Sequence, residues 1–351
     1  MMWVIVAFLI LSFLVFFHEL GHFLVAKMFG VRVEVFSIGF GKKIWKKTFG
    51  QTEYAISAIP LGGYVKLKGQ DDTDPLASND DNDSYTAKSH WKRICILLAG
   101  PLFNLVLAFL IYMALAMGGQ KMLLPIIGEL QPDMPASQSD LRPGDSIISV
   151  NGTNVRNWSE LNVAVMDAKG DIKIVFMRQG KRLETLIQPK KMVSKNIFGE
   201  TIERNFIGIV SKGEFGVVRY DVKDSLVYAF EQTYRGAKLI LQSIEKIFVG
   251  VVPVSEVGGV ITIVDLISQA SQSGVVVLAT LVALISVNLG VLNLLPIPAL
   301  DGGQILFNLY EMLTGKRISE KSLYALTMFG WALLIGLMAL GIYNDIFRLV
   351  H

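Results

Sequence analysis

Charged residues and cysteine are scarce in this sequence. The first scarcity argues against a fully soluble protein, and the second excludes internal disulfides. Only 18% of its 351 residues are charged, against about 25% in an average soluble domain. Hydrophobic residues make up 52%, and the mean hydropathy is +0.48. The single cysteine, Cys95, excludes an internal disulfide and is most simply a small packed residue. The composition predicts an integral membrane protein with some water-soluble mass.

The sequence also lacks the features of a nucleic-acid-binding protein and of a cleavable signal peptide. The formal net charge is only +3, and no Lys/Arg-rich tract carries interleaved aromatic residues, so nucleic acid is not an expected partner. The N-terminus has neither a basic stretch before its apolar run nor an A-x-A cleavage site. We therefore expect the first apolar run to remain as a membrane span rather than to be removed as a signal peptide.

That first apolar run contains the most informative motif, an H-E-x-x-H formed by His18, Glu19 and His22. Residues 4–26 are long enough to cross a bilayer, which needs about 20 residues. Histidines four residues apart lie on one face of a helix and can bind one metal ion. Neutral imidazoles suit zinc, and Glu19 is then placed to take a proton from water.

The alternative is a buried polar cluster that only helps helices to pack. Ionisable groups are costly in hydrocarbon, so those inside a membrane span generally serve a function. The apolar surroundings of the motif therefore favour the metal site.

The segment that follows, residues 30–92, is rich in lysine and is predicted to be cytoplasmic by the positive-inside rule. Residues 52–66 indicate two short strands around a Pro/Gly turn, apolar enough for a membrane-associated hairpin. Two interpretations stay open: a strand edge that pairs with an extended substrate, or a plain cytoplasmic hairpin. The candidate contacts on such an edge are Tyr54, Ile56, Gly62 and Gly63. Residues 71–83, rich in Asp, Asn and Ser, are typical of a flexible solvated linker.

A second span is predicted over residues 93–118, and a region of different character follows it. Asn104, inside this span, is more typical of a hydrogen bond between helices than of catalysis.

From residue 120 to 215, short β-like runs alternate with turns, and residues 158–168 favour a helix. The β-like runs cover residues 126–130, 146–150 and 172–176. This length suffices for one small domain, expected on the periplasmic or extracellular side.

The stretch Leu-Arg-Pro-Gly-Asp-Ser-Ile-Ile-Ser-Val-Asn-Gly at residues 141–152 strongly resembles PDZ domains. In the circularly arranged bacterial type the peptide-binding strand comes last, and Ile207, Gly208 and Ile209 fit that place. PDZ domains bind extended peptides by strand addition. A spacer that only restricts access to the membrane site is the alternative interpretation.

The third span, residues 275–303, ends in the sequence Asn-Leu-Leu-Pro-Ile-Pro-Ala-Leu-Asp-Gly-Gly. Asp301 in this stretch is the natural third zinc ligand, because the remaining histidines, His90 and His351, lie in the linker and at the end of the chain. A carboxylate that only caps the glycines is the alternative. Asn293 has two equally supported roles: holding substrate backbone or an oxyanion, and packing helices.

The fold class predicted is a polytopic α-helical membrane protein with about four transmembrane helices, an inserted mainly-β PDZ domain and a membrane-associated β-hairpin. The predicted boundaries are residues 1–29 for the first span, 30–92 for the cytoplasmic loop, 93–118 for the second span, 120–215 for the PDZ domain, 220–273 for amphipathic membrane-surface helices, 275–303 for the third span, 304–322 for a second cytoplasmic loop and 323–345 for the fourth span. The charge of the loops and the even number of spans place both termini outside.

H-E-x-x-H in the first span, N-x-x-P-x-P-x-L-D-G-G in the third and a PDZ domain between them resemble the site-2 protease family, above all its bacterial RseP-type branch. The resemblance covers nearly the whole chain and implies one zinc ion on His18, His22 and Asp301, with Glu19 activating water. It also implies that Asn293, and with it Asn104, engages the unwound segment of the substrate.

The same resemblance implies substrates and a location. The expected substrates are single-span membrane proteins already trimmed on their outer side, such as anti-sigma factors or signal-peptide remnants, cleaved in regulated intramembrane proteolysis. The expected location is the bacterial inner membrane, with the termini and the PDZ domain periplasmic and the active site toward the cytoplasm. One departure is that the best-known RseP-type members carry two tandem PDZ domains, whereas this chain has room for one.

Two alternative functions fit the composition less well than the protease does. A non-catalytic membrane scaffold usually loses a ligand or the base, and here all four residues of the site are present. A metal transporter needs several ionisable sites along a path, whereas this chain concentrates them at one point.

Overall fold

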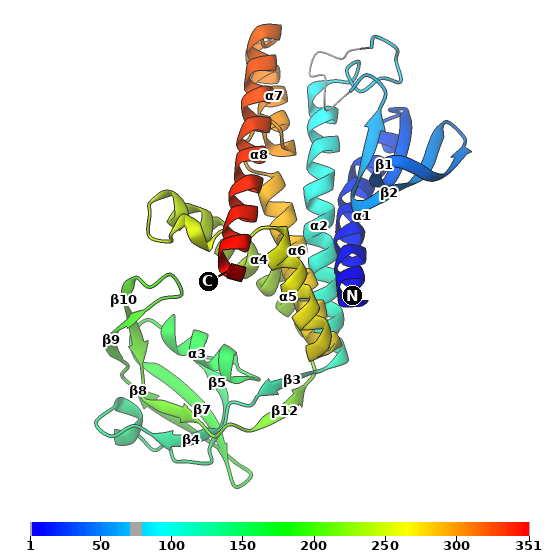
Figure 1. Cartoon of the computed structure of the whole chain (residues 1–351). Coiled ribbons are helices and arrows are strands. Elements are labelled where there is room, and N and C mark those ends of the chain that lie inside the picture. The colour runs from blue at the N-terminus through cyan, green and yellow to red at the C-terminus, as the bar shows by residue number, and fades with distance from the viewer. Residues whose placement is uncertain (1, 71–78, 351) are drawn as a thin grey trace. The chain divides into compact units, whose positions relative to one another are not determined.

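A computed structural model of the chain describes residues 2–70 and 79–350. The chain separates into two compact units. The first unit is formed by the chain up to Met113 and from Val227 onward, and the second by Ala114–Leu226. Figure 1 shows long helices and a small sheet in the first unit, and mainly strands in the second.

The first unit contains the membrane-spanning part of the protein. Within the described residues, four helices are long and apolar enough to cross a membrane, as predicted. They are α1 (Met2–Met28), α2 (His90–Gly118), α6 (Val275–Asn293) and α8 (Glu320–Val350). Leu14, Leu107 and Val282 form a buried cluster that joins α1, α2 and α6.

Glycines let these helices approach one another closely. A Cβ added to Gly21 of α1 would lie 2.3 Å from the carbonyl oxygen of Ala99 in α2. A Cβ added to Gly290 of α6 would lie 2.9 Å from the carbonyl oxygen of Pro101. Small residues at such crossings are the usual way for membrane helices to pack backbone against backbone. These contacts bring the middle of α2 against both α1 and α6.

The hairpin beside α1 differs from its prediction in length and in the position of its turn. It consists of β1 (Val33–Phe49) and β2 (Thr52–Leu67), so the turn lies at Gly50 and Gln51. The predicted turn at residues 60–63 lies inside β2 instead. Gly50 has a φ of +62°, which glycine adopts at no steric cost and which a tight turn requires. The Pro/Gly stretch therefore bends a long strand without ending it.

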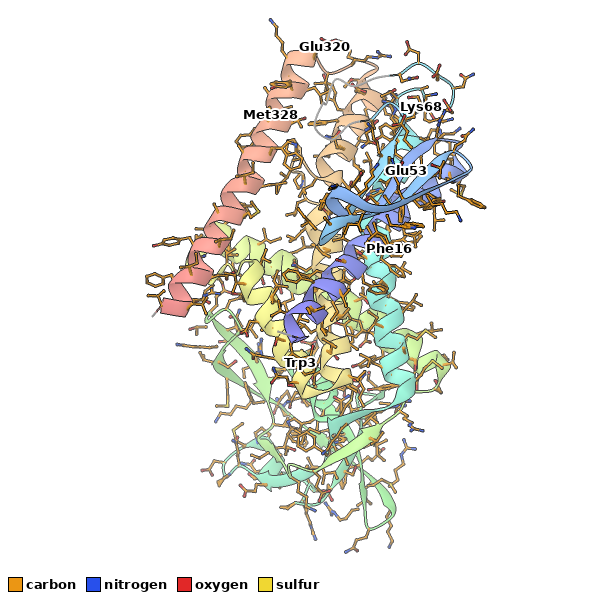
Figure 2. The ribbon with its side chains drawn as sticks, turned by 45° about the vertical axis from the view of Figure 1, so that its right-hand side comes forward. Trp3, Phe16, Glu53, Lys68, Glu320 and Met328 are labelled. Carbon is orange, nitrogen blue, oxygen red and sulfur yellow. The ribbon has the colours of Figure 1, made fainter. Side chains whose placement is uncertain are left out.

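The register of the hairpin places the first half of β1 between two segments of β2. Phe36 lies opposite both Val65 and Tyr54, and Ile38 lies opposite both Gly63 and Ile56. The β2 segment over residues 59–67 therefore occupies an edge of the sheet. The sheet lies beside α1 near Phe16 (Figure 2). It packs there through aromatic rings, with the Phe36 ring centroid 5.6 Å from that of Phe16.

The predicted acidic linker falls partly outside the described residues, because residues 71–78 are not among them. Its described end is held by Lys68, whose ammonium lies 2.7 Å from Asp81 and 2.6 Å from Asp83. These hydrogen bonds raise the pKa of Lys68, and the bond from Lys68 lowers the pKa of Asp83. Residues 79–83 are therefore tied to the end of β2.

The second unit is the predicted β-rich insertion. The predicted β-like runs correspond to β4 (Ile127–Leu130), β5 (Ser146–Val150) and β7 (Ile172–Arg178), and the predicted helix to α3 (Trp158–Met166). The remaining strands are β3 (Gln120–Leu123), β6 (Thr153–Asn154), β8 (Lys181–Ile187), β9 (Lys190–Lys195), β10 (Thr201–Phe206), β11 (Ile209–Ser211) and β12 (Phe215–Val218).

The strands of the second unit enclose a core of their own. A four-stranded sheet has the order β6-β5-β7-β8, and three strand pairs, β10-β9, β11-β4 and β12-β3, accompany it. Ile172, Ile174 and Phe176 of β7 point into the core with Leu161 of α3, as a period of two predicts. Strand β5 contributes Ile147 and Val150, which lie on either side of a register shift. The strand β12 is a departure, because three of its four residues lie beyond residue 215, where the predicted domain ends.

Helices connect the second unit to the last two spans. They are α4 (Val222–Phe248) and α5 (Val260–Ser273), with a short 3-10 turn at Val254–Glu256 between them and Gly259 as the residue that precedes α5. The third span ends earlier than predicted, at Asn293, because Pro296 and Pro298 lack the amide hydrogens that a helix needs. The predicted loop over residues 304–322 is largely helical as well: α7 (Asp301–Thr314) ends at Gly315, whose φ is +66°.

Candidate metal centre

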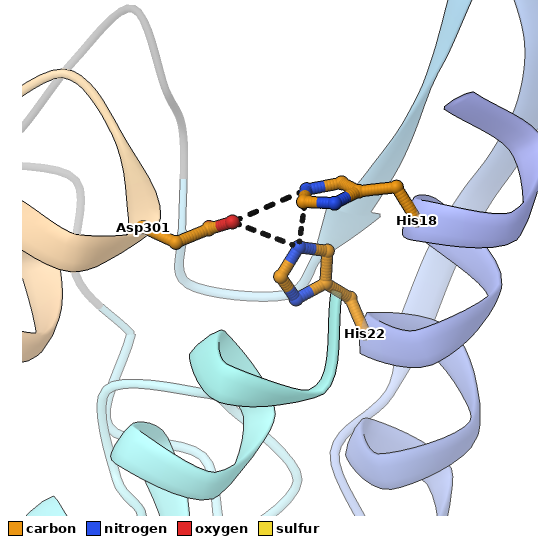
Figure 3. Close-up of side chains that lie close together, drawn as sticks. All are labelled: His18, His22 and Asp301. Carbon is orange, nitrogen blue, oxygen red and sulfur yellow. Dashed lines mark hydrogen bonds and ion pairs between the residues drawn. The ribbon is translucent and has the colours of Figure 1, made fainter. Parts of the chain in front are cut away.

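Three side chains from distant parts of the sequence meet at one point of the first unit (Figure 3). His18 and His22 come from neighbouring turns of α1, and Asp301 is the first residue of α7. Asp301 Oδ2 lies 3.1 Å from His18 Nε2 and 3.5 Å from His22 Nε2. The two Nε2 atoms are 3.2 Å apart. The structure thus brings together the three residues that the sequence predicts as metal ligands.

These distances fit a tetrahedral metal site. Zinc binds imidazole nitrogen and carboxylate oxygen at about 2.0–2.2 Å, so its ligand atoms lie about 3.3 Å from one another. The three measured separations, 3.1, 3.2 and 3.5 Å, are close to that edge length. Three protein ligands leave the fourth position open, as in catalytic zinc sites.

The surroundings of Asp301 also favour a cation. Asp301 Oδ2 is buried and accepts no hydrogen bond from any residue that the structure describes. A buried carboxylate oxygen without a donor costs free energy, which a metal ion in front of it would offset. Its place at the first turn of α7 is favourable too, because helix N-termini attract negative charge.

The glycines after Asp301 explain how this carboxylate reaches the histidines. A Cβ on Gly302 would lie 2.3 Å from the carbonyl oxygen of Leu295, and one on Gly303 would lie 2.2 Å from that of Ile297. Any larger residue would push the start of α7 away from the turn that follows α6. In the D-G-G sequence, Asp301 therefore supplies the ligand, and the two glycines allow the close backbone packing that places it.

Helix α2 supports both histidines from behind. His22 Nδ1 lies 2.8 Å from the carbonyl oxygen of Ile96, so Nδ1 carries the hydrogen and Nε2 keeps its lone pair for a metal. Asn104 lies at the corresponding nitrogen of the other histidine, with its Nδ2 3.3 Å from His18 Nδ1. Gly100 stands between these two supports, and a Cβ there would lie 2.2 Å from His22 Nε2.

The candidate general base, Glu19, follows His18 on α1 and is half-buried. Its Oε2 accepts a hydrogen bond from the backbone N–H of Val65 in β2, at 3.1 Å. The hairpin therefore orients the carboxylate that neighbours the ligand cluster. This backbone donor could not be found from the sequence, because any residue except proline carries one.

The residues predicted to contact substrate occupy different environments. Asn293 is half-buried at the last turn of α6, whereas Asn104 is fully buried against His18. Tyr54 is half-buried, with its ring centroid 6.1 Å from that of Phe23, and Ile56 is 47% exposed.

The two hairpin glycines predicted as substrate contacts are buried. A Cβ would lie 2.4 Å from the Phe40 ring at Gly62 and 2.6 Å from the Ser37 carbonyl oxygen at Gly63. Close packing of the hairpin is therefore enough to explain why both positions need glycine.

The predicted peptide-binding segment of the second unit is partly occupied by that unit itself. The Ile207 side chain lies in the core, and the Ile207 carbonyl accepts from the Ala136 N–H at 2.8 Å. The Gly208 carbonyl accepts from the Gln131 N–H at 2.8 Å, and Ile209 pairs with Leu130. An added peptide would therefore have to use the opposite edge of β11, which has one neighbour, β4, among the described strands.

Comparison with known proteins agrees with this geometry. The model of peptidase family M50 matches residues 6–337 of the chain. A protein of Campylobacter jejuni named "Putative zinc metalloprotease" is 43% identical over 342 residues, covering 97% of this chain and 92% of that protein. A protein of the same printed name from Helicobacter pylori is 41% identical over 353 residues, covering 99% of both chains. One from Mesorhizobium japonicum is 32% identical over 355 residues, covering 96% of both.

Proposed function

This chain belongs to peptidase family M50, the site-2 protease family, and is a zinc metalloprotease, and we propose that it hydrolyses peptide bonds inside the membrane-spanning segments of single-span proteins. One observation carries the proposal. The ligand atoms of His18, His22 and Asp301 lie at the edge lengths of a tetrahedral zinc site, and both histidines belong to a helix that can span a membrane.

The chemistry follows from the residues around that site. A bound zinc ion supplies a Lewis acid that polarises the scissile carbonyl and lowers the pKa of water toward neutrality. Glu19, held by the Val65 N–H, takes the proton from the attacking water and passes it to the leaving amine. Asn293, at the end of α6, is the candidate donor to the oxyanion or to substrate backbone.

The substrate has to be unwound before it can react, because a helix shields its carbonyl groups with its own hydrogen bonds. The β2 segment over residues 59–67 offers an edge for strand pairing, and Val65 connects that edge to Glu19. A substrate paired there would be extended where it passes the base. Anti-sigma factors and signal-peptide remnants are the substrate classes that the family resemblance favours.

The second unit would then limit which proteins reach the site. We assign it as a single PDZ domain that either binds a peptide tail along the open edge of β11 or excludes large outer domains. The positive-inside rule favours the periplasmic side of a bacterial inner membrane for this unit and for both termini, because the loops at residues 30–92 and 304–322 carry lysine and arginine. The exposed Phe230 and Tyr234 of α4 suit a helix lying on the membrane surface.

Cleavage of a defined reporter tests this function. The purified chain is placed in lipid vesicles with two single-span reporters, one trimmed on its outer side and one with a folded outer domain. We expect the trimmed reporter to be cut, at a bond within its apolar span, and the cut to disappear with a zinc chelator and return with added zinc. Mass spectrometry of the fragments locates the bond. Cleavage only in the soluble flanks, or cleavage insensitive to chelator, would contradict the proposal.

Removing a backbone donor from the edge of β2 tests substrate pairing. Ile59, 49% exposed, begins the edge segment, and Ile59→Pro should lower cleavage about tenfold or more while zinc content stays at the wild-type level. Ile44→Pro is the matched control, because Ile44 is 72% exposed and has no partner in the hairpin register. Equal activity of the two variants would argue against strand pairing at this edge.

A further inference from the structure

One face of α2 carries three residues that meet the two histidines, at intervals of four. Ile96 accepts from His22 through its carbonyl, Gly100 leaves the space that both rings occupy, and Asn104 faces His18. Residues four apart lie one above the other on a helix, so this is a single stripe. Ile96 and Asn104 stand in the same relation to their histidines, each at the ring nitrogen that does not face Asp301.

The contact between Asn104 and His18 places a hydrogen-bond donor against a nitrogen that must itself carry a hydrogen. With Nε2 turned toward Asp301, a neutral His18 that binds a metal must carry its hydrogen on Nδ1. The group that faces Nδ1 is Asn104 Nδ2, also a donor, at 3.3 Å. At the same time Asn104 Oδ1 is buried and accepts no hydrogen bond from any described residue. Two donors therefore face each other while an acceptor goes unused.

Turning the Asn104 amide by half a turn removes both conflicts. The oxygen and nitrogen of an amide have nearly the same shape, so the hydrogen-bond network decides between the two orientations. In the turned orientation Oδ1 accepts from His18 Nδ1–H. Because Asn104 is fully buried, this role is separate from contact with a substrate.

We propose that Asn104 is a positioning residue that accepts the Nδ1 hydrogen of His18, and so holds Nε2 toward the zinc. This inference rests on the zinc site proposed above. Its consequence is that Asn104 contributes to metal affinity by fixing one tautomer and one ring orientation. Partners that orient a histidine in this way typically contribute 10- to 100-fold to metal affinity.

Two other features of the structure bear on the test. The carbonyl of Gly100 also approaches the His18 ring and is a second possible acceptor. The Asn104 backbone carbonyl accepts a hydrogen bond from Ser286 Oγ at 2.7 Å, which joins α2 to α6. A variant of Asn104 can therefore act through the histidine or through helix packing, and the experiment has to separate the two.

The test compares zinc affinity across four full-length variants in detergent, measured by competition with a chelator. Asn104→Leu has a similar size and no acceptor, and Asn104→Ala is a smaller second variant in case the first does not fold. Asn104→Asp keeps an acceptor that cannot be turned the wrong way. Ser286→Ala removes the hydrogen bond from Ser286 Oγ to the Asn104 carbonyl and leaves the Asn104 and His18 side chains unchanged.

We expect Asn104→Leu and Asn104→Ala to bind zinc about 10- to 100-fold more weakly, with Asn104→Asp and Ser286→Ala close to wild type. Cobalt in place of zinc should give the wild-type absorption spectrum in Asn104→Asp and a changed one in Asn104→Leu. Wild-type affinity in Asn104→Leu would overturn the inference and assign the role to the Gly100 carbonyl. Equal weakening in Asn104→Asp and Ser286→Ala would overturn it in favour of packing. A wild-type chain that binds no zinc would instead refute the metal site itself.

Discussion

Replacing Glu19 with Gln should leave zinc bound and lower cleavage by about 100- to 10,000-fold, the usual contribution of a general base. Glutamine has nearly the same shape, and its side-chain oxygen can still accept from the Val65 N–H that now holds Glu19. The neutral amide cannot take a proton from water. Zinc content and the cleavage rate of the trimmed reporter, measured on the same preparation, give the result.

Glu53→Gln is the matched control for Glu19→Gln. Glu53 lies on the hairpin and pairs with Lys43, whose hydrogen bond lowers the pKa of Glu53. This pair is half-buried and takes no part in the ligand cluster, so cleavage should remain near the wild-type rate. A Glu19→Gln variant that cleaves normally would show that another group acts as the base.

A single methyl group at Gly100 should disable the site without touching a ligand. The Cβ of Gly100→Ala would lie 2.2 Å from His22 Nε2 and 2.9 Å from His18 Cε1, well below ordinary contact at 3.4 Å or more. The His22 ring would have to move by about 1 Å, and a misplacement of that size costs about 100-fold in rate. We expect weak zinc binding and loss of cleavage together.

Gly118→Ala controls for the effect of alanine on the same helix. Gly118 is the last residue of α2, and a Cβ there would meet nothing within 4 Å. This variant should keep both zinc and activity. Full zinc occupancy in Gly100→Ala would mean that α2 does not shape the metal site in the way the contacts indicate.

The sequence was informative where the chemistry depends on side chains at fixed spacing. Histidines at positions 18 and 22 share a helix face whatever the rest of the chain does, and the scarcity of other histidines directed attention to Asp301. The four spans follow from apolar length alone, which is why their number was predicted and only their ends moved.

The sequence was uninformative where backbone groups or close contacts determine the position of a residue or an element. The supports at Ile96 and Val65 are a carbonyl and an N–H, and side-chain identity does not reveal either. The hairpin turn was misplaced because the Pro/Gly stretch looks like a turn locally, whereas its place inside β2 follows from packing against Phe40 and Ser37. The helix α7 was missed because the third span was extended through Pro296 and Pro298 to residue 303, whereas α6 ends before these prolines and α7 begins at Asp301.

Zinc content of the wild-type chain and of Asp301→Ala tests the central claim most directly. Asp301 is the ligand that joins α7 to the H-E-x-x-H helix, and its carboxylate is the only contribution from that half of the chain among the described ligands. The account predicts about one zinc per wild-type chain, and little or none together with no reporter cleavage in Asp301→Ala. A wild-type chain without zinc, or an Asp301→Ala chain that keeps its zinc and still cleaves, would contradict it.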